Sequence, residues 1–258
     1  MKAPSFAYAK ARTLAEAFEL IERPGAKILA GGQSLIPSLN MRLSAPELLV
    51  DVTGLAGLSN IETKAGAVRI GALCTHAMLE RSPEVREHLP LLAEAMPHIA
   101  HPAIRNRGTL GGSLALADPA AELPACAVAL DAVLVVGSKK GERRVRAVDF
   151  FKGLFETDLR TGEMLLAAEF PRAEKSAFLE LTRRHGDYAI VGLAAVTKQR
   201  ERRIALFGFA DRPVLIQPQS LEAAKAGLPR PAADLYHSSA TKLHLAKVLL
   251  ERAWTRLL

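Results

Sequence analysis

Cysteine is scarce in this sequence, with only Cys74 and Cys126 among 258 residues. The two are far apart, and neither lies in a Cys-x-x-Cys pair or at a metal-ligand spacing from a histidine. This scarcity argues against a disulfide framework, a zinc site or an iron–sulfur cluster held by this chain alone. We expect both residues to be small, buried apolar side chains. If the protein takes part in redox chemistry, the redox group must be a bound cofactor.

Aromatic residues make up only 5% of the chain, so the core must rest mainly on Leu, Val, Ile and Ala. Long apolar runs are also absent, because no stretch approaches the roughly 18 residues that a membrane helix needs. The first ten residues, MKAPSFAYAK, lack the apolar core of a signal peptide. These absences predict a soluble cytoplasmic protein without a membrane span.

Basic residues exceed acidic residues by 34 to 27, which gives a net charge of +7. Part of the excess lies in two runs, residues 139–144 and 198–203, which we interpret as turns between apolar stretches. A nucleic-acid surface would favour a continuous basic face with interleaved aromatic residues, and neither run has them. The sequence therefore predicts no nucleic-acid partner, and the runs are interpreted as solvated turns or as a surface for an acidic partner.

Helix signals are clear at several places. Thr13 and Glu16 have the spacing of a capping box, and apolar residues recur at helical spacing over 14–21. Ser82-Pro83 is a strong helix start, and one helix is predicted to carry an apolar stripe at Val85, Leu89, Leu92 and Met96. Asp118-Pro119 is expected to begin a helix that runs to about Leu130, and a last helix is expected from about Ser239.

Strands and irregular segments complete the pattern. Residues 101–113 contain proline, asparagine and three glycines, which predicts irregular backbone. The basic run at 139–144 is expected to join a hairpin of residues 133–136 and 145–148. Further strands are expected at residues 26–30, 48–52, 68–72, 165–170, 177–182, 189–197 and 204–209.

This order of elements predicts an α+β protein with two domains. The first domain is expected to span residues 1–160, with subdomains of about 1–55 and 56–160. Strands followed by helices suggest a separate C-terminal α+β domain over residues 161–258. The boundary is placed at the Thr161-Gly162 turn.

Two glycine pairs are the most informative feature of the sequence. The first lies in Ala30-Gly31-Gly32-Gln33-Ser34 and the second in Thr109-Leu110-Gly111-Gly112-Ser113. Glycine lets the backbone approach a ligand closely, and successive N–H groups in such turns can bind the two negative charges of a pyrophosphate. An ordinary tight turn is the simpler interpretation of each pair alone. Neither pair matches the Rossmann or P-loop pattern, so those nucleotide-binding motifs are absent.

The residues around the glycine pairs continue as a series of ordered motifs. Together they resemble the FAD-binding medium subunit of molybdenum hydroxylases, the family of carbon monoxide dehydrogenase and xanthine dehydrogenase. The match covers nearly the whole chain. It is carried by residues 30–43 (AGGQSLIPSLNMRL) with Pro46 and 50–52 (VDV), 70–72 (IGA) with Thr75-His76, 101–112 (HPAIRNRGTLGG), 118–125 (DPAAELPA), 130–132 (LDA), 184–191 (RHGDYAIV) and 238–240 (SSA).

The resemblance implies a fold and a cofactor site. The fold is a two-subdomain FAD-binding domain of the vanillyl-alcohol-oxidase/PCMH type, followed by the small C-terminal domain. One FAD is expected between the subdomains, and no metal ligand or catalytic side chain is assigned to this chain. The implied cofactor-binding residues are Lys27, Leu29, Ala30, Gly31, Gly32, Gln33, Ser34, Ala100, Thr109, Leu110, Gly111, Gly112, Ser113, Asp118, Leu165 and Tyr188.

For some residues in these motifs, a structural role competes with a role in binding. Asp118 is implied to accept hydrogen bonds from a polar part of FAD, but before Pro119 it could equally be a helix cap. Tyr188 is implied to lie near the isoalloxazine ring, but it could be a core residue. His76 and His101 are interpreted as structural, because a flavin that only relays electrons needs no acid–base catalyst. Arg105 and Arg107 could contact phosphate or brace the loop.

The implied function is an electron-transfer subunit. In the resembled enzymes, electrons pass from a molybdenum cofactor on a large subunit through [2Fe–2S] clusters on a small subunit to FAD, and then to an external electron acceptor. The complex is expected to be a heterohexamer, and its substrate and acceptor are not encoded in this chain. Alternatives are a self-contained FAD oxidase or dehydrogenase of the same fold and an assembly subunit that has lost its cofactor. Two departures from the family are Ser113, where many relatives carry Asn or Asp, and a shorter stretch between Ala195 and Asp234.

Overall fold

The computed structural model describes residues 2–64 and 66–257. Its N-terminal part is a small parallel sheet with strand order β1-β3-β2, formed by β1 (Ala7–Lys10), β2 (Ala26–Leu29) and β3 (Leu48–Asp51). Helix α1 (Leu14–Ile21) connects β1 to β2, and α2 (Leu35–Asn40) lies between β2 and β3. Thr13 caps α1 by accepting a hydrogen bond from the Glu16 backbone N–H, as the capping box predicts.

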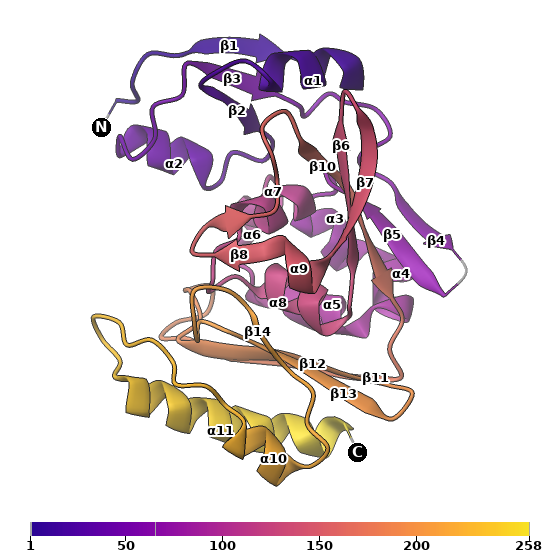
Figure 1. The fold of residues 1–258 in the computed structure, drawn as a ribbon, viewed down its shortest axis with the longest axis vertical. Coiled ribbons are helices and arrows are strands. Elements are labelled where there is room, and N and C mark those ends of the chain that lie inside the picture. Colours follow the sequence, from indigo (N-terminus) through magenta and orange to yellow (C-terminus); the bar gives the residue numbers. More distant parts are fainter. Residues whose placement is uncertain (1, 65, 258) are drawn as a thin grey trace.

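The middle part contains a five-stranded antiparallel sheet with order β4-β5-β10-β6-β7. Its strands are β4 (Ile61–Lys64), β5 (Ala67–Gly71), β6 (Val133–Ser138), β7 (Gly141–Arg146) and β10 (Met164–Pro171). Helices fill the long stretch between β5 and β6, and Figure 1 shows them gathered beside this sheet. They are α3 (His76–Arg81), α4 (Pro83–His88), α5 (Pro90–Ala95), the 3₁₀ turn η1 (Met96–His98), α6 (Pro102–Arg105), α7 (Leu110–Leu116) and α8 (Glu122–Ala129).

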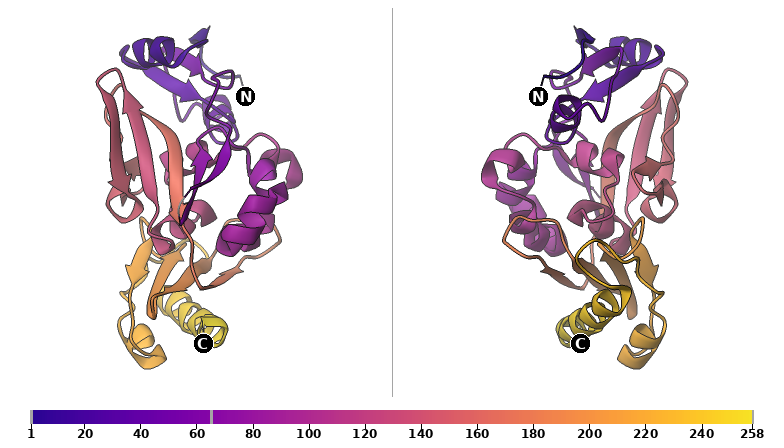
Figure 2. Two further views of the ribbon diagram at one scale, coloured as in Figure 1. Left: turned by 90° about the vertical axis from the view of Figure 1, so that its right-hand side faces the viewer. Right: turned by 90° about the vertical axis from the view of Figure 1, so that its left-hand side faces the viewer.

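The C-terminal part is a four-stranded antiparallel sheet backed by two helices. The strands are β11 (Lys175–Leu181), β12 (Val191–Lys198), β13 (Glu201–Phe207) and β14 (Val214–Ile216). The helices are α10 (Leu221–Ala226) and α11 (Ser239–Leu257), which lie at the end of the molecule opposite the N-terminal sheet (Figure 1). Leu193 and Ala195 of β12 face these helices, whereas Ala194 and Val196 face the helices of the middle part. Both faces of this sheet are therefore buried (Figure 2).

Prolines divide the long helix that the apolar stripe predicted. Pro90 has no backbone N–H and restricts Leu89 to a non-helical conformation, so α4 ends at His88 and α5 begins at Pro90. The stripe residues are nevertheless all buried in one core, so the prediction was right about the face and wrong about one continuous helix. Ser82 caps α4 as predicted, because its hydroxyl accepts a hydrogen bond from the Val85 N–H at 3.2 Å.

Two further segments differ from the sequence prediction. Residues 101–113 are not irregular throughout, because they contain α6 and the start of α7. Asp118 does not start α8, which begins at Glu122; its carboxylate instead accepts a hydrogen bond from the Ala120 N–H in a turn before that helix. Short polar and proline-containing sequences thus formed local turns that periodicity alone does not locate.

The basic runs lie partly on strands rather than in turns. Residues 141–146 form β7, and the expected strand at 145–148 is instead the end of β7 followed by the short helix α9 (Ala147–Phe150). Arg143 is paired with Asp158 and Glu163, and the Arg203 guanidinium donates to the last carbonyl groups of α8. The side chains of Arg143 and Arg203 are therefore already paired with groups of the same chain.

Strand β10 lies beyond the predicted domain boundary at residue 160, yet it pairs with β5 and β6 in the middle sheet. A boundary after Pro171 fits this sheet membership better than one at 160. The hairpin of β8 (Phe151–Gly153) and β9 (Glu156–Thr157) precedes β10. Cys74 and Cys126 are both buried in the core of the middle part, as expected. Among the helices that the structure describes, none is long and apolar enough to cross a membrane.

Candidate functional site

The first glycine segment follows β2, at the carboxyl edge of the parallel N-terminal sheet. Leu29 of β2 is level with Asp51 of β3, so the chain leaves both strands at the same edge. Ligands of parallel sheets commonly bind at this edge, where loops leave the strands together. Gly32 has φ of +72°, a left-handed conformation that favours glycine. The loop is closed by Gln33, whose side-chain amide donates to the Gly31 carbonyl at 3.1 Å.

Gly31 brings the first segment into contact with Arg107 and Gly108, which directly precede the second segment. A Cβ atom on Gly31 would lie 2.2 Å from the carbonyl oxygen of Arg107 and 2.9 Å from Cα of Gly108. Such distances are far below van der Waals contact, so only glycine permits this approach. The two glycine segments, 78 residues apart between Gly31 and Thr109 in the numbering, therefore belong to one region of the surface.

A pocket of about 480 Å³ opens at this junction. Backbone N–H groups of Gly31, Gly32, Gln33 and Ser34 make no hydrogen bond within the described residues. A run of free N–H groups in a loop with a left-handed residue is a typical anion-binding arrangement. The pocket is lined by Leu29, Ala30, Gly31, Gly32, Gln33, Ile36, Pro37, Asp51, Thr53 and Arg107.

The second glycine segment is built differently from the first. Thr109 is the N-cap of α7, and its hydroxyl accepts a hydrogen bond from the Gly112 N–H at 3.0 Å. The Gly111 N–H donates to the Ala72 carbonyl, and a Cβ atom on Gly111 would lie 2.6 Å from the Ala72 side chain. The predicted set of free amides is thus present at residues 31–34 and not at Leu110, Gly111, Gly112 and Ser113, whose N–H groups already have partners. Here glycine serves close packing against the segment that follows β5.

Asp51 and Thr53 line the pocket but were missed by the sequence analysis. The Asp51 carboxylate accepts hydrogen bonds from the Thr53 N–H and hydroxyl on one oxygen and from the Tyr8 hydroxyl on the other. Partial burial alone would raise the pKa of Asp51, but the hydrogen bonds from Thr53 and Tyr8 outweigh it and lower that pKa. The available signal was the position of Asp51 at the end of a strand parallel to β2.

Arg105 and Arg107, which the sequence could not separate, have different roles in the structure. The Arg105 guanidinium is buried and makes two hydrogen bonds to the Glu80 carboxylate at 3.0 and 3.1 Å. It also donates to the carbonyl groups of Ile99 and Ala100, so it braces the loop before α6. Arg107 is exposed and lines the pocket. Arg107 is therefore the cation available to an anionic ligand.

His76 is a structural residue in this arrangement. Its Nε2 lies 3.1 Å from the Thr109 carbonyl, and its ring lies against Gly108. Burial lowers the pKa of His76 to about 4, so the ring is neutral at physiological pH. His101 is exposed and packs against Gly186. The geometry of His76 agrees with the structural interpretation.

The remaining predicted residues lie outside this pocket. Tyr188 is 70% exposed, so it is not a core residue. Its partial desolvation and the nearby negative charge of Asp118 raise its pKa. Ala100 has φ of +45° and its carbonyl packs against Gly186, which joins the loop before α6 to the loop that carries Tyr188. Leu165 is buried in β10, and Lys27 is exposed on β2. The residues of the first glycine segment therefore line the pocket. Asp118 and Tyr188 lie near each other but outside it.

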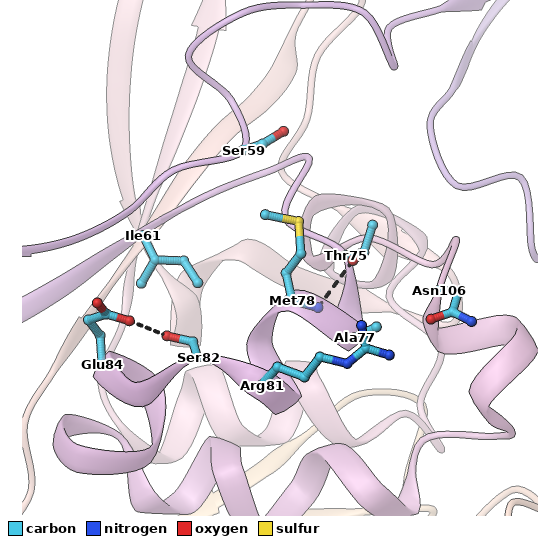
Figure 3. Close-up of a pocket in the computed structure, with 9 residues that line it drawn as sticks. All are labelled: Ser59, Ile61, Thr75, Ala77, Met78, Arg81, Ser82, Glu84 and Asn106. Carbon is cyan, nitrogen blue, oxygen red and sulfur yellow. Dashed lines mark hydrogen bonds between the residues drawn. The ribbon is translucent and has the colours of Figure 1, made fainter.

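A second pocket of about 540 Å³ is lined by a neighbouring residue of the same loop. Asn106 lines it, whereas the next residue, Arg107, lines the first pocket. Figure 3 shows Met78, Arg81 and Ile61 around this hollow, with the Ser82 hydroxyl bonded to Glu84. The sequence analysis singled out none of these as cofactor-binding residues.

Comparison with known proteins places this geometry in a family. Residues 4–173 match the family described as FAD binding domain in molybdopterin dehydrogenase. The chain belongs to this family. Among relatives, the 6-hydroxypseudooxynicotine dehydrogenase complex subunit alpha of Paenarthrobacter nicotinovorans is 45% identical over 207 residues, covering 78% of this chain and 70% of the relative. The carbon monoxide dehydrogenase medium chain of Afipia carboxidovorans is 33% identical over 240 residues, covering 89% and 83%.

Solved structures agree with the family. Quinoline 2-oxidoreductase from Pseudomonas putida 86 superposes with a TM-score of 0.92 at 37% identity, covering 98% of this chain and 96% of that one. Reconstituted CO dehydrogenase from Oligotropha carboxidovorans gives a TM-score of 0.94 at 32% identity, covering 99% of this chain and 98% of that one. This member of the molybdopterin dehydrogenase FAD-binding family is thus a mixed α/β flavoprotein subunit, which confirms the resemblance and the cofactor predicted from the sequence.

Proposed function

We propose that this chain holds one FAD with its pyrophosphate at the free N–H groups of residues 31–34 and relays electrons through it. The observation that carries the proposal is the close approach of Gly31 to Arg107, which sets these amides and the Arg107 guanidinium around one pocket. When bound, the flavin accepts electrons and passes them on to an acceptor. The protein's part is to bind the cofactor, orient it and set the charge around it.

The donor set of the pocket fits a diphosphate. Backbone N–H groups and a guanidinium are the donors that proteins use for phosphate oxygens. The one carboxylate that lines the pocket, Asp51, already accepts bonds from Tyr8 and Thr53 on both oxygens. We infer that Asp51 serves hydroxyl groups next to the diphosphate rather than the diphosphate itself. The three hydrogen bonds leave one acceptor position on Oδ2 for such a hydroxyl.

The other predicted residues are assigned by the same proposal. Tyr188 has an exposed ring that can cover an aromatic cofactor, and Asp118 on the same side can accept a bond from a cofactor hydroxyl. Ala100 and Leu165 are proposed to contact FAD through their backbones, and Lys27 to lie near the adenine end. The second glycine segment is proposed to contact FAD from the side opposite residues 31–34, with Thr109 and Ser113 contributing hydroxyl groups. Its residues are Thr109, Leu110, Gly111, Gly112 and Ser113.

The arrangement of parts supports the finer fold assignment. A small parallel sheet and an antiparallel sheet with the cofactor pocket near their junction are what a PCMH-type FAD domain requires. We therefore assign the N-terminal part and the middle part to the two subdomains and the region after Pro171 to the C-terminal domain. The high coverage of quinoline 2-oxidoreductase supports the presence of the third part despite the shorter stretch between Ala195 and Asp234.

The partners are inferred from the relatives. Their names describe medium subunits or chains and a dehydrogenase complex subunit. We propose that this chain works with a large subunit that holds a molybdenum cofactor and a small subunit that holds [2Fe–2S] clusters, assembled as a heterohexamer. Cys74 and Cys126 are buried and separate, so they would not ligate a cluster. Substrate choice then belongs to the large subunit, and the acceptor of the electrons is external.

Absorbance and electron delivery test the function together. We expect the purified chain to show flavin absorbance near about 370 and 450 nm. With the two partner subunits, the substrate of the complex should bleach the band at the longer wavelength, whereas the chain alone should leave substrate unchanged. Absence of bound flavin after reconstitution would contradict the proposal. Turnover by the chain alone would instead favour the self-contained oxidase.

The two arginines provide a matched pair of variants for the site. We expect Arg107→Gln to weaken FAD binding by about tenfold, because a charge-assisted hydrogen bond contributes about 1.5–3 kcal/mol, and to leave the melting temperature of the FAD-free chain unchanged. Arg105→Gln should lower the free energy of unfolding by about 1–3 kcal/mol, because it removes charge-assisted hydrogen bonds to the partly buried Glu80 carboxylate and to the Ile99 carbonyl. Titration with FAD and urea unfolding measure the two effects. If a folded Arg105→Gln protein lost as much affinity for FAD as Arg107→Gln, the phosphate contact could not be assigned to Arg107 alone.

A further inference from the structure

The second pocket, of about 540 Å³, has no part in the proposed flavin site. One of its walls is helix α3, which begins after Thr75 because the Thr75 hydroxyl accepts a hydrogen bond from the Met78 N–H at 3.2 Å. The core-facing residues of this helix are buried, whereas Met78 and Arg81, three positions apart, share its outer face. Both side chains therefore line the pocket (Figure 3).

Several polar groups of this pocket are not used by the fold. The Arg81 guanidinium is exposed and makes no ion pair or hydrogen bond to any described residue. The Asn106 side chain lines the pocket from the loop after α6, and it is likewise exposed and unpaired among the described residues. The Thr75 hydroxyl accepts one hydrogen bond but keeps its own proton to donate. A guanidinium, an amide and a hydroxyl are donors that bind the oxygens of an anion.

The opposite end of the pocket is mainly apolar. Ile61 of β4 and Met78 of α3 line it, and Met78 is 40% exposed although its side chain is apolar. Glu84 also lines this end, and its carboxylate accepts a hydrogen bond from the Ser82 hydroxyl at 2.7 Å. Figure 3 shows Glu84 beside Ile61, with Asn106 at the other end of the pocket. The pocket therefore has one end rich in donors and one end that offers apolar contacts.

This division indicates the class of ligand. Pockets of about 300–1,000 Å³ hold small molecules in proteins, and this one falls in that range. A guanidinium can bind a planar carboxylate through two parallel hydrogen bonds, and a thioether adapts well to an apolar group. A doubly charged anion such as phosphate would meet only one cation, Arg81, together with the negative charge of Glu84. A small monocarboxylate with an apolar body therefore fits better.

The loop after α6 connects this pocket to the first one. Asn106 lines the second pocket, and the next residue, Arg107, lines the first. The backbone of the loop is tied to the start of α3, because the His76 N–H donates to the Gly108 carbonyl at 2.9 Å. A ligand that bonds both to α3 and to the Asn106 side chain therefore restrains the loop that carries Arg107.

We propose that this second pocket binds a small organic monocarboxylate and that its occupancy strengthens FAD binding. The carboxylate group lies at Arg81 and Asn106, and the apolar body lies against Ile61 and Met78. The bound ligand restrains the loop that carries Arg107, so part of the entropy cost of ordering this loop around FAD has already been met. The site itself does not depend on the proposed function, whereas its effect on FAD rests on that function.

Calorimetric titration of the purified protein with benzoate tests the site, and acetate serves as a carboxylate with almost no apolar body. We expect saturable benzoate binding in wild type and about tenfold weaker binding of acetate, which buries less apolar surface. Arg81→Gln should weaken benzoate binding by about tenfold, because it removes a charge-assisted hydrogen bond. Arg86→Gln changes an exposed arginine of α4 that does not line the pocket, and this matched control should bind as wild type does. No saturable binding in wild type, or an equal loss in the two variants, would overturn the proposal.

Fluorescence titration with FAD, with and without saturating benzoate, tests the effect on the cofactor. Wild type should bind FAD about fivefold more tightly with benzoate, which is at the lower end of typical coupling between two sites, and Arg81→Gln should show no difference. Benzoate binding that leaves the affinity for FAD unchanged would overturn the coupling. If the chain binds no FAD, the missing flavin absorbance identifies a failure of the proposed function, and the coupling fails with it. The benzoate titration then decides by itself whether the second pocket is a carboxylate site.

Discussion

Replacing Gly31 by alanine is expected to lower the affinity for FAD by about a hundredfold. The new Cβ atom would lie 2.2 Å from the Arg107 carbonyl oxygen, and a backbone atom cannot turn away as a side chain can. Overpacking of this kind costs about 1–3 kcal/mol, and about 1.4 kcal/mol corresponds to a tenfold change in affinity. Relief of the clash separates the free amides of residues 31–34 from Arg107, which divides the proposed diphosphate site.

Gly54→Ala is the matched control for this substitution. Gly54 lies in the same N-terminal part, and its Cβ would approach only the flexible end of the Lys10 side chain, at 3.2 Å. We expect its FAD affinity to stay within about twofold of wild type, because a movable side chain can absorb the contact. Fluorescence titration with FAD measures both variants. Equal affinity in Gly31→Ala and Gly54→Ala would show that the approach of Gly31 to Arg107 does not build the site.

Local sequence signals located most elements because each had a direct physical cause. The capping residues Thr13 and Ser82 mark the starts of α1 and α4, where their hydroxyls satisfy free N–H groups. Nearly continuous burial along β12 reflects a strand covered on both faces, which its apolar sequence predicts. The sequence failed where a proline and tertiary contacts compete with periodicity. Pro90 splits one apolar stripe into two helices, and β10, which follows the expected boundary at residue 160, pairs with β5 and β6 of the middle sheet.

The two glycine segments differ in whether their backbone N–H groups are free, and the sequence does not distinguish them. Gly31 and Gly32 follow a strand, and the structure leaves their N–H groups free, as the glycine pair suggested. Gly111 and Gly112 have the same sequence appearance, yet their N–H groups are taken by Ala72 and Thr109. Only the three-dimensional position of residue 72 shows that the Gly111 N–H is used within the fold, whereas that of Gly31 is free. Asp51 was missed for a related reason, because its place in the pocket depends on the parallel register of β3 with β2.

Glu122→Gln is expected to stabilise the protein at alkaline pH and much less at acidic pH. The folded state raises the pKa of Glu122 from 4.5 to about 7, so between these values the folded protein binds more protons at this group than the unfolded chain. The stability that Glu122 contributes is therefore fully present below about pH 4.5 and is lost as pH rises through about 7. One pKa unit corresponds to about 1.4 kcal/mol, so wild type loses up to about 3 kcal/mol that glutamine, which is never charged, retains.

Urea unfolding at about pH 5 and about pH 8 measures this difference, with FAD at one fixed concentration because a ligand of the native state adds its own stability. The hydrogen bond to Glu180 raises the pKa of His98, so the stability that His98 contributes is likewise lost as pH rises. Its ring is present in both proteins, so the difference between wild type and Glu122→Gln depends mainly on Glu122. The gain in the free energy of unfolding should be larger at the higher pH. Glu19→Gln, which changes an exposed glutamate of α1, is the control and should show no such trend. A gain that is the same at both pH values would show that burial in the folded protein does not raise the pKa of Glu122.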